Sequence, residues 1–205
     1  FRSQSDALCP QLRGMPSSNK KPPPYCISAL ILGLEGAGKT TLWQQLRSIN
    51  ATGSFKAGPA IEVTPTAGNE LSSWVYKDTK ITIKEVGGLM VGQWVKSLKN
   101  FDVLLYLVDM SNSLQLGTSC IELFNLLTQE AVAQREVLVL LTKEDMPSTF
   151  SSATFHQLSQ LESIKAHHPH LRLTVMEVCA FTARNSDAVL QWLCDRRRPM
   201  TTSDS

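Results

Sequence analysis

The sequence predicts an α/β domain built on a mostly parallel six-stranded sheet, with one antiparallel edge hairpin and helices on both faces. Two observations lead to this fold class. Near-continuous apolar runs, as expected of central parallel strands, alternate along the chain with segments whose apolar residues recur at helical spacing. One further segment, which follows the first helical pattern, has the alternating pattern of a hairpin.

The strands are expected from apolar content and alternation. Four of them are predicted at residues 25–33, 101–110, 136–142 and 171–179. The segment 69–85 predicts the two strands of the hairpin, with a turn near Asp78-Thr79. Because helical patterns separate most of these strands, a mostly parallel sheet is favoured over an all-antiparallel one.

The helices are expected where apolar residues recur with a helical period. After the first strand, Leu42, Leu46 and Ile49 have this spacing. A second apolar stripe consists of Leu116, Cys120, Leu123 and Leu127. Two more helices are predicted at about 151–166 and at 187–197.

Composition restricts the class of protein. A chain of 205 residues with 42% hydrophobic content is long enough for one domain with a sizeable core. The formal charge of +2 is too small to indicate nucleic acid or an anionic membrane as the main partner. The five cysteines are scattered without a C-x-x-C spacing, which fits a reducing compartment better than a disulfide framework or a zinc site. We therefore expect a cytoplasmic protein that binds no nucleic acid.

The two ends of the chain differ in character from the middle. Residues 1–24 are rich in Pro, Ser and Lys and have no period, so a disordered tail is expected there. Within it, residues 1–14 are expected to lie upstream of a native start at Met15. The folded domain is expected at 25–197, followed by a flexible C-terminal tail at 198–205.

The strongest functional signal is the segment GLEGAGKT, which lies between a predicted buried strand and a predicted helix. It fits the pattern G-x-x-x-x-G-K-[ST], in which backbone N–H groups and the helix N-terminus hold phosphate oxygens. Lys39 would reach the outer phosphates and the Thr40 hydroxyl would ligate Mg²⁺. A plain connecting turn would not require Lys and Thr at these positions. The expected phosphate-binding residues here are Gly33, Leu34, Glu35, Gly36, Ala37, Gly38, Lys39, Thr40 and Thr41.

A second signal, TKED at 142–145, follows the strand predicted at 136–142. A carboxylate such as Asp145 can accept hydrogen bonds from the ring N–H and the exocyclic amine of guanine, whereas adenine would leave it unpaired. The methylenes of Lys143 can cover the base. Such tetrads are common on protein surfaces, but the position after a buried strand and beyond the glycine-rich loop favours guanine recognition.

Together with PTAGN (65–69), EVGG (85–88) and CAFTARN (179–185), these motifs fall in the order and spacing of one family. From about residue 26 to 195 the chain resembles the Arf-like small GTPases of the Ras superfamily, and most of all a divergent member of that series. The resemblance implies the P-loop NTPase fold of small G-proteins, with GTP or GDP and Mg²⁺ as ligands. It also implies a molecular switch that shows its GTP form to effector proteins and is served by exchange and activating factors.

The resemblance assigns further residues to the site. Thr66 would meet Mg²⁺ and the γ-phosphate, and the backbone N–H of Gly88 would meet the γ-phosphate. Glu85 would contact the metal through water. Thr142 with Lys143 and Asp145 would hold the guanine, supported by Cys179 and Ala180.

The sequence departs from the family at three of these positions. The family usually has Asp in place of Glu85, Gln in place of Leu89 and Asn in place of Thr142. The longer Glu85 is expected to weaken metal affinity, and Thr142 lacks an amide that ties the base pocket to the phosphate loop. Leucine cannot orient an attacking water, so intrinsic GTP hydrolysis is expected to be very slow and no catalytic residue is certain. An alternative is that Gln93 supplies the missing group.

Membrane attachment also differs from the family. Met15 is followed by Pro16, so there is no M-G start for myristoylation, and the C-terminus lacks a prenylation box. No stable lipid anchor is therefore expected. The segment PPPY (22–25) fits the P-P-x-Y pattern read by WW domains, with a simple linker as the alternative.

Three functional hypotheses remain open on the sequence. The first is the guanine-nucleotide switch. The second is a pseudo-GTPase scaffold with weak or no turnover, which the residues Glu85, Leu89 and Thr142 favour. The third is a P-loop kinase acting on a small molecule, which usually needs an Arg-bearing lid; Arg135 is the only arginine between 110 and 170.

Overall fold

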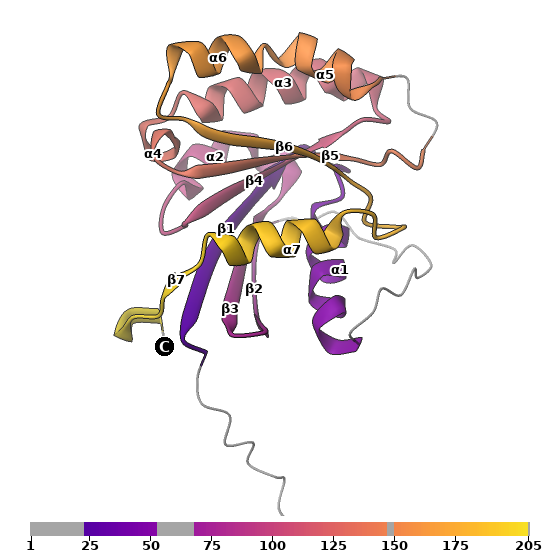
Figure 1. Ribbon diagram of the computed structural model, residues 1–205. Coiled ribbons are helices and arrows are strands. Elements are labelled where there is room, and N and C mark those ends of the chain that lie inside the picture. The colour runs from indigo at the N-terminus through magenta and orange to yellow at the C-terminus, as the bar shows by residue number, and fades with distance from the viewer. Residues whose placement is uncertain (1–22, 53–67, 147–149, 205) are drawn as a thin grey trace, which may run out of the picture.

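The computed structural model describes residues 23–52, 68–146 and 150–204 (Figure 1). Over these ranges, seven strands form one sheet in the order β2-β3-β1-β4-β5-β6, and β7 pairs with β1 outside this path. The strands are β1 (Tyr25–Gly33), β2 (Asn69–Tyr76), β3 (Thr79–Val86), β4 (Val103–Asp109), β5 (Glu136–Thr142), β6 (Arg172–Val178) and β7 (Arg198–Pro199). The helices are α1 (Lys39–Thr52), α2 (Val91–Ser97), α3 (Ser113–Leu127), α4 (Glu130–Ala133), α5 (Ser152–Ser159), α6 (Leu161–His167) and α7 (Ser186–Asp195), with short 3₁₀ turns η1 (Gly88–Met90) and η2 (Thr202–Asp204).

The prediction of a mostly parallel sheet with one antiparallel edge hairpin is confirmed. β3, β1, β4, β5 and β6 are parallel neighbours, whereas β2 runs antiparallel to β3 at one edge. The central strand β4 is buried along its whole length, which explains why it is apolar from Val103 to Val108 rather than alternating.

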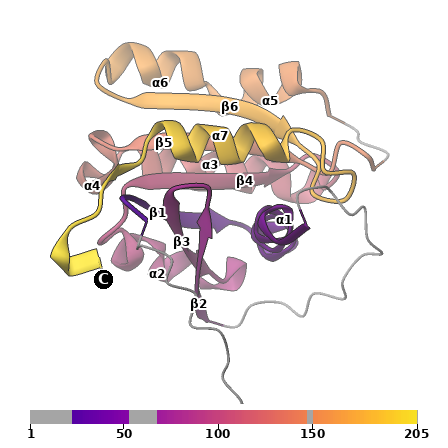
Figure 2. The same ribbon diagram turned by 60° about the horizontal axis from the view of Figure 1, so that its bottom comes forward.

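Helices cover both faces of this sheet, as Figure 1 and Figure 2 show. On β4, Leu104 and Tyr106 belong to the core under α2, α3, α5 and α6. Leu105 and Leu107 point the other way, into the core under α1 and α7. Successive side chains of one strand thus fill two separate cores, as the pleat of a strand requires. Among the described residues, no helix has both the length and the apolar content needed to cross a membrane.

The helix expected at about 151–166 is two helices in the structure. Gln160 adopts a left-handed conformation (φ 52°, ψ 28°) and separates α5 from α6. Phe155 on α5 and Leu161 on α6 are both buried in the same core. The break therefore keeps both apolar faces on the sheet, although the sequence contains no Gly or Pro to mark it.

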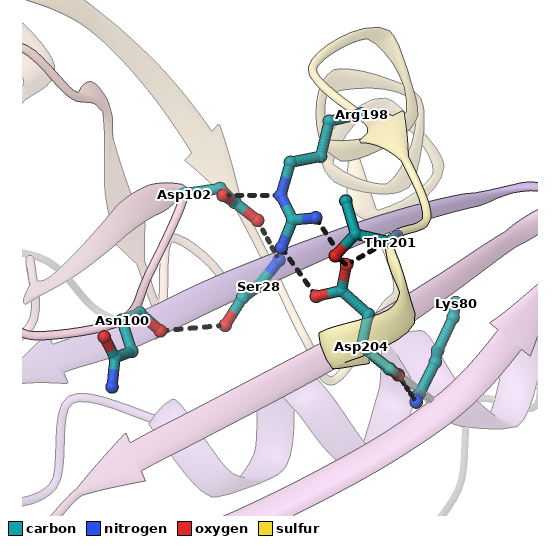
Figure 3. Close-up of polar contacts among 7 residues, drawn as sticks. All are labelled: Ser28, Lys80, Asn100, Asp102, Arg198, Thr201 and Asp204. Atoms are coloured by element: carbon teal, nitrogen blue, oxygen red, sulfur yellow. Dashed lines mark hydrogen bonds and ion pairs between the residues drawn. The ribbon is translucent and has the colours of Figure 1, made fainter.

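Residues 198–204, where the sequence predicts a flexible tail, form β7 and the short turn η2. β7 pairs with the start of β1, and the Arg198 guanidinium donates to both carboxylate oxygens of Asp204 at 2.7 and 2.8 Å (Figure 3). Its Nε donates to Asp102 at 3.1 Å, and Lys80 donates to the backbone carbonyl of Asp204. This segment is fixed by polar contacts with distant residues, which leave no apolar pattern in the sequence.

Tyr25, the tyrosine of PPPY, is the first residue of β1. The Arg197 guanidinium carbon lies 4.6 Å from the centre of its ring. Residue 22 of this motif, the native start proposed at Met15 and the metal-binding role of Thr66 fall outside the described residues.

Candidate functional site

The glycine-rich loop lies where its motif predicts, between the end of β1 and the start of α1. Gly36 (φ 76°) and Gly38 (φ 84°) adopt conformations that side chains rarely tolerate. A Cβ at either position would meet nothing within 4 Å, so glycine is required here by the backbone and not by crowding. The loop therefore has the turn that directs backbone N–H groups toward an anion at the start of α1.

Lys39 is the buried cation of this loop. Its side-chain nitrogen donates to the carbonyls of Gly33 at 2.9 Å and Leu34 at 3.0 Å. Burial lowers the pKa of Lys39, and the nearby carboxylates of Glu85 and Glu35 oppose that shift. The hydrogen bonds given for this buried ammonium go to carbonyls, so an added anion such as a phosphate would stabilise it.

Thr40 and Glu85 meet directly beside the loop. The Thr40 hydroxyl donates to the two carboxylate oxygens of Glu85 at 2.7 and 3.0 Å, and the indole N–H of Trp43 donates to the same carboxylate at 2.7 Å. Glu85 is only 1% exposed. A hydroxyl and a carboxylate held together are the hard oxygen ligands that suit Mg²⁺, so the described part of the expected metal site fits this ion.

The backbone of Gly88 lies against the glycine-rich loop. A Cβ at Gly88 would be 2.2 Å from the amide nitrogen of Glu35 and 2.5 Å from the carbonyl carbon of Leu34. Glycine is therefore required here by space, and the closest neighbour in this structure is the loop itself. The next residue, Leu89, is 69% exposed and has no polar group to offer.

Four of the five residues expected to hold guanine, all except Cys179, line a cavity of 420 Å³. Its walls are Gly38, Thr41, Leu42, Thr142, Lys143, Asp145, Met146, Val178, Ala180 and Phe181. Met146 and Phe181 are each 50% exposed at this cavity, and sequence reasoning did not single them out. Met146 directly follows TKED, and Phe181 lies within CAFTARN. Their apolar side chains beside these motifs were the signal that could have identified them.

Cys179 contacts the carboxylate of this cavity. Its thiol donates to Asp145 at 3.1 Å and accepts from the backbone N–H of Thr182 at 3.3 Å. Lys143 has a left-handed backbone (φ 64°), and its ammonium pairs with Asp109 at 2.8 Å. These contacts hold the side chains of Lys143 and Asp145 at the cavity.

Thr142 joins the cavity to the glycine-rich loop. Its buried hydroxyl lies 3.0 Å from the carbonyl of Ala37 and 3.1 Å from that of Val108. Thr142 lacks the amide that the family usually has at this position. In this structure its hydroxyl reaches the loop directly.

Comparison with known proteins places these features in one family of sequences. Residues 19–197 match the family model described as the ADP-ribosylation factor family. The chain is 34% identical over 165 residues to ADP-ribosylation factor-like protein 16 of Homo sapiens, covering 80% of this chain and 83% of that protein. It is 29% identical over 166 residues to ADP-ribosylation factor-like protein 1 of Drosophila melanogaster, covering 80% and 85%.

A solved structure shares the fold. The Arl6 BBS3 small GTPase from Trypanosoma brucei, determined with the bound nucleotide analogue GppNp, superposes with a TM-score of 0.69 at 19% identity. The match covers 83% of this chain and 96% of that one.

Proposed function

This chain belongs to the ADP-ribosylation factor family of small GTPases, and from that premise we propose that it is a cytoplasmic switch that binds GTP and GDP with Mg²⁺ and hydrolyses GTP very slowly by itself. The GTP form would present its switch surfaces to effector proteins. Exchange and activating factors would then control which nucleotide is bound.

The observation that carries the proposal is the bond between Thr142 and Ala37. The cavity that contains Asp145 and the loop that contains Lys39 are joined by this contact at 3.0 Å, so they can serve one ligand. That ligand needs a base with two adjacent donors for the carboxylate and a phosphate chain for the loop. A guanine nucleotide has both.

Slow hydrolysis is supported by the residue after Gly88. Leu89 has no donor or acceptor with which to orient water, and its side chain lies mostly in solvent. Gln93 is exposed on α2 and remains the alternative source of such a group. When bound, Mg²⁺ would neutralise phosphate charge; Thr40 and Glu85 are the described residues that would hold it.

A pseudo-GTPase scaffold is the second candidate, and one observation favours it. The Glu85 carboxylate accepts hydrogen bonds from Thr40 and Trp43, so donors of the protein itself satisfy it. A protein with such a site can keep its fold when neither metal nor nucleotide is bound.

Bound nucleotide and turnover, measured on one preparation, separate these candidates. Nucleotide would be extracted from the purified full-length chain and identified, and single-turnover GTP hydrolysis would then be followed with and without Mg²⁺. Guanine nucleotide with negligible turnover is expected. Protein that neither carries nor takes up GTP would favour the scaffold, and rapid turnover would contradict the role given to Leu89.

Base specificity has its own test. Asp145→Asn exchanges a double acceptor for a group that also donates, so preference should move from guanine toward xanthine nucleotides. Glu144→Gln alters the neighbouring acid, whose carboxylate pairs with Arg184 and is absent from the cavity wall, and it should leave preference unchanged. If Asp145→Asn kept the guanine preference of the wild type, the assignment of TKED to base recognition would be wrong.

A further inference from the structure

Two residues of helix α1 donate hydrogen bonds to Glu85. Thr40 and Trp43 stand three positions apart on α1, which places them on the same face of that helix. Both donate to the carboxylate of Glu85, the last residue but one of the facing strand β3. The indole bond at 2.7 Å is as short as the closer of the two Thr40 contacts.

A buried carboxylate is stable only when donors satisfy it, and its direction follows those donors. Trp43 is 5% exposed and packs in the core under α1 and α7, so its ring cannot follow a moving partner. The rigid side chain of the pair is therefore the indole, and the flexible one is the glutamate.

We propose that Trp43 is a positioning residue for the metal: its indole N–H fixes the Glu85 carboxylate beside the Thr40 hydroxyl, where it can help to hold Mg²⁺. This inference rests on the proposed function. Compared with aspartate, Glu85 has one more methylene and therefore one more rotatable bond. The hydrogen bond from Trp43 restrains that bond and keeps the carboxylate in one orientation.

A simpler interpretation is that Trp43 is a core residue whose N–H needs some acceptor. Two other tryptophans argue against this simpler interpretation. Trp74 and Trp192 belong to the same core, and each buries its indole nitrogen with no hydrogen-bond partner among the described residues. This core thus accommodates an indole N–H without an acceptor, so the bond to Glu85 is not a general requirement of its packing.

The test compares Trp43→Phe with Trp192→Phe. Both changes remove an indole N–H from the same core at similar burial, 5% and 6% exposed, but only the first removes a bond to Glu85. The full-length variants would be loaded with a fluorescent GDP analogue, and its release would be followed while free Mg²⁺ is varied. Thermal unfolding would be recorded in parallel.

Trp43→Phe should raise the Mg²⁺ concentration that half-maximally slows release by about tenfold, the effect of losing a partner that orients a metal ligand. Release in excess chelator should be unchanged. Trp192→Phe should match the wild type in both measurements, even if both variants unfold at slightly lower temperature.

A second pair of variants tests the coupling. Aspartate lacks the methylene that brings the carboxylate to the indole, so Trp43→Phe should have no further effect on Mg²⁺ dependence in a Glu85→Asp background. An equal effect in both backgrounds would show that Trp43 acts through something other than Glu85.

Each remaining outcome has a distinct meaning. Equal Mg²⁺ dependence in Trp43→Phe and the wild type would overturn this inference and leave the proposed function intact. Faster release from Trp43→Phe in chelator as well would mean that the residue shapes the nucleotide pocket, which also overturns it. A wild type that binds no GDP analogue would refute the proposed function and this inference with it.

Discussion

Gly88→Ala probes the contact between the segment after β3 and the glycine-rich loop. The added Cβ would lie 2.2 Å from the Glu35 amide nitrogen, whereas real Cβ contacts under 3.0 Å essentially do not occur. Because the obstructing atoms are backbone, no side chain can rotate away and one of the two segments must move. Such overpacking costs about 1–3 kcal/mol.

The displaced segment would be either the glycine-rich loop or the segment around Gly88, and both belong to the expected phosphate site. Denaturant unfolding should show a loss of about 1–3 kcal/mol for Gly88→Ala. GTP affinity should fall more than GDP affinity, because the Gly88 N–H is expected at the γ-phosphate. Gly92→Ala is the matched control, since a Cβ there meets nothing within 4 Å and alanine is the better helix former within α2.

The result is informative in either direction. If Gly88→Ala were as stable as Gly92→Ala and bound GTP as the wild type does, the close approach of these two backbones would not exist in solution. A loss of stability with an unchanged ratio of GTP to GDP affinity would keep the contact but remove Gly88 from the γ-phosphate.

Three further outcomes are expected. Leu89→Gln should accelerate single-turnover GTP hydrolysis without changing GTP affinity; no gain would indicate that the missing water-orienting group is not what limits turnover. Thr142→Val keeps the side-chain shape but leaves the carbonyls of Ala37 and Val108 without this donor, so denaturation should show a loss of about 1–3 kcal/mol together with weaker GDP binding. Hydrogen bonds from Arg198 hold the pKa of Asp204 below its usual value, so the stability gained over Asp204→Asn should be complete at neutral pH and shrink as pH falls below about 4. A difference between these two proteins that does not change with pH in acid denaturation would contradict that pairing.

Local patterns were sufficient for six of the seven strands of the sheet and for the glycine-rich loop. β4 and β5 are mostly apolar because both of their faces are covered, and this appears in the sequence as two near-continuous apolar runs. The loop is equally local, because the positive φ angles of Gly36 and Gly38 demand glycine at those two positions.

Features that depend on distant partners could not be predicted in the same way. Thr142 and Ala37 are separated by 105 positions, and Trp43 and Glu85 by 42. Trp43 is a core residue, and no sequence pattern indicates the acceptor of its N–H. β7 could not be predicted from the sequence either, because its two residues are held by pairing with β1 and by the contacts of Arg198.

The three departures from the family are not equivalent in physical terms. At Glu85 and Thr142 the replaced side chain is buried and has polar neighbours in the fold, the Trp43 indole in one case and the Ala37 carbonyl in the other. At Leu89 the side chain lies mostly in solvent and can form no hydrogen bond, so it does not itself supply the lost group. The two compensated positions concern holding the nucleotide and its metal, and the uncompensated one concerns cleaving it. Binding and hydrolysis are therefore expected to separate in this protein, with turnover dependent on a group that a partner brings to the exposed side of Leu89.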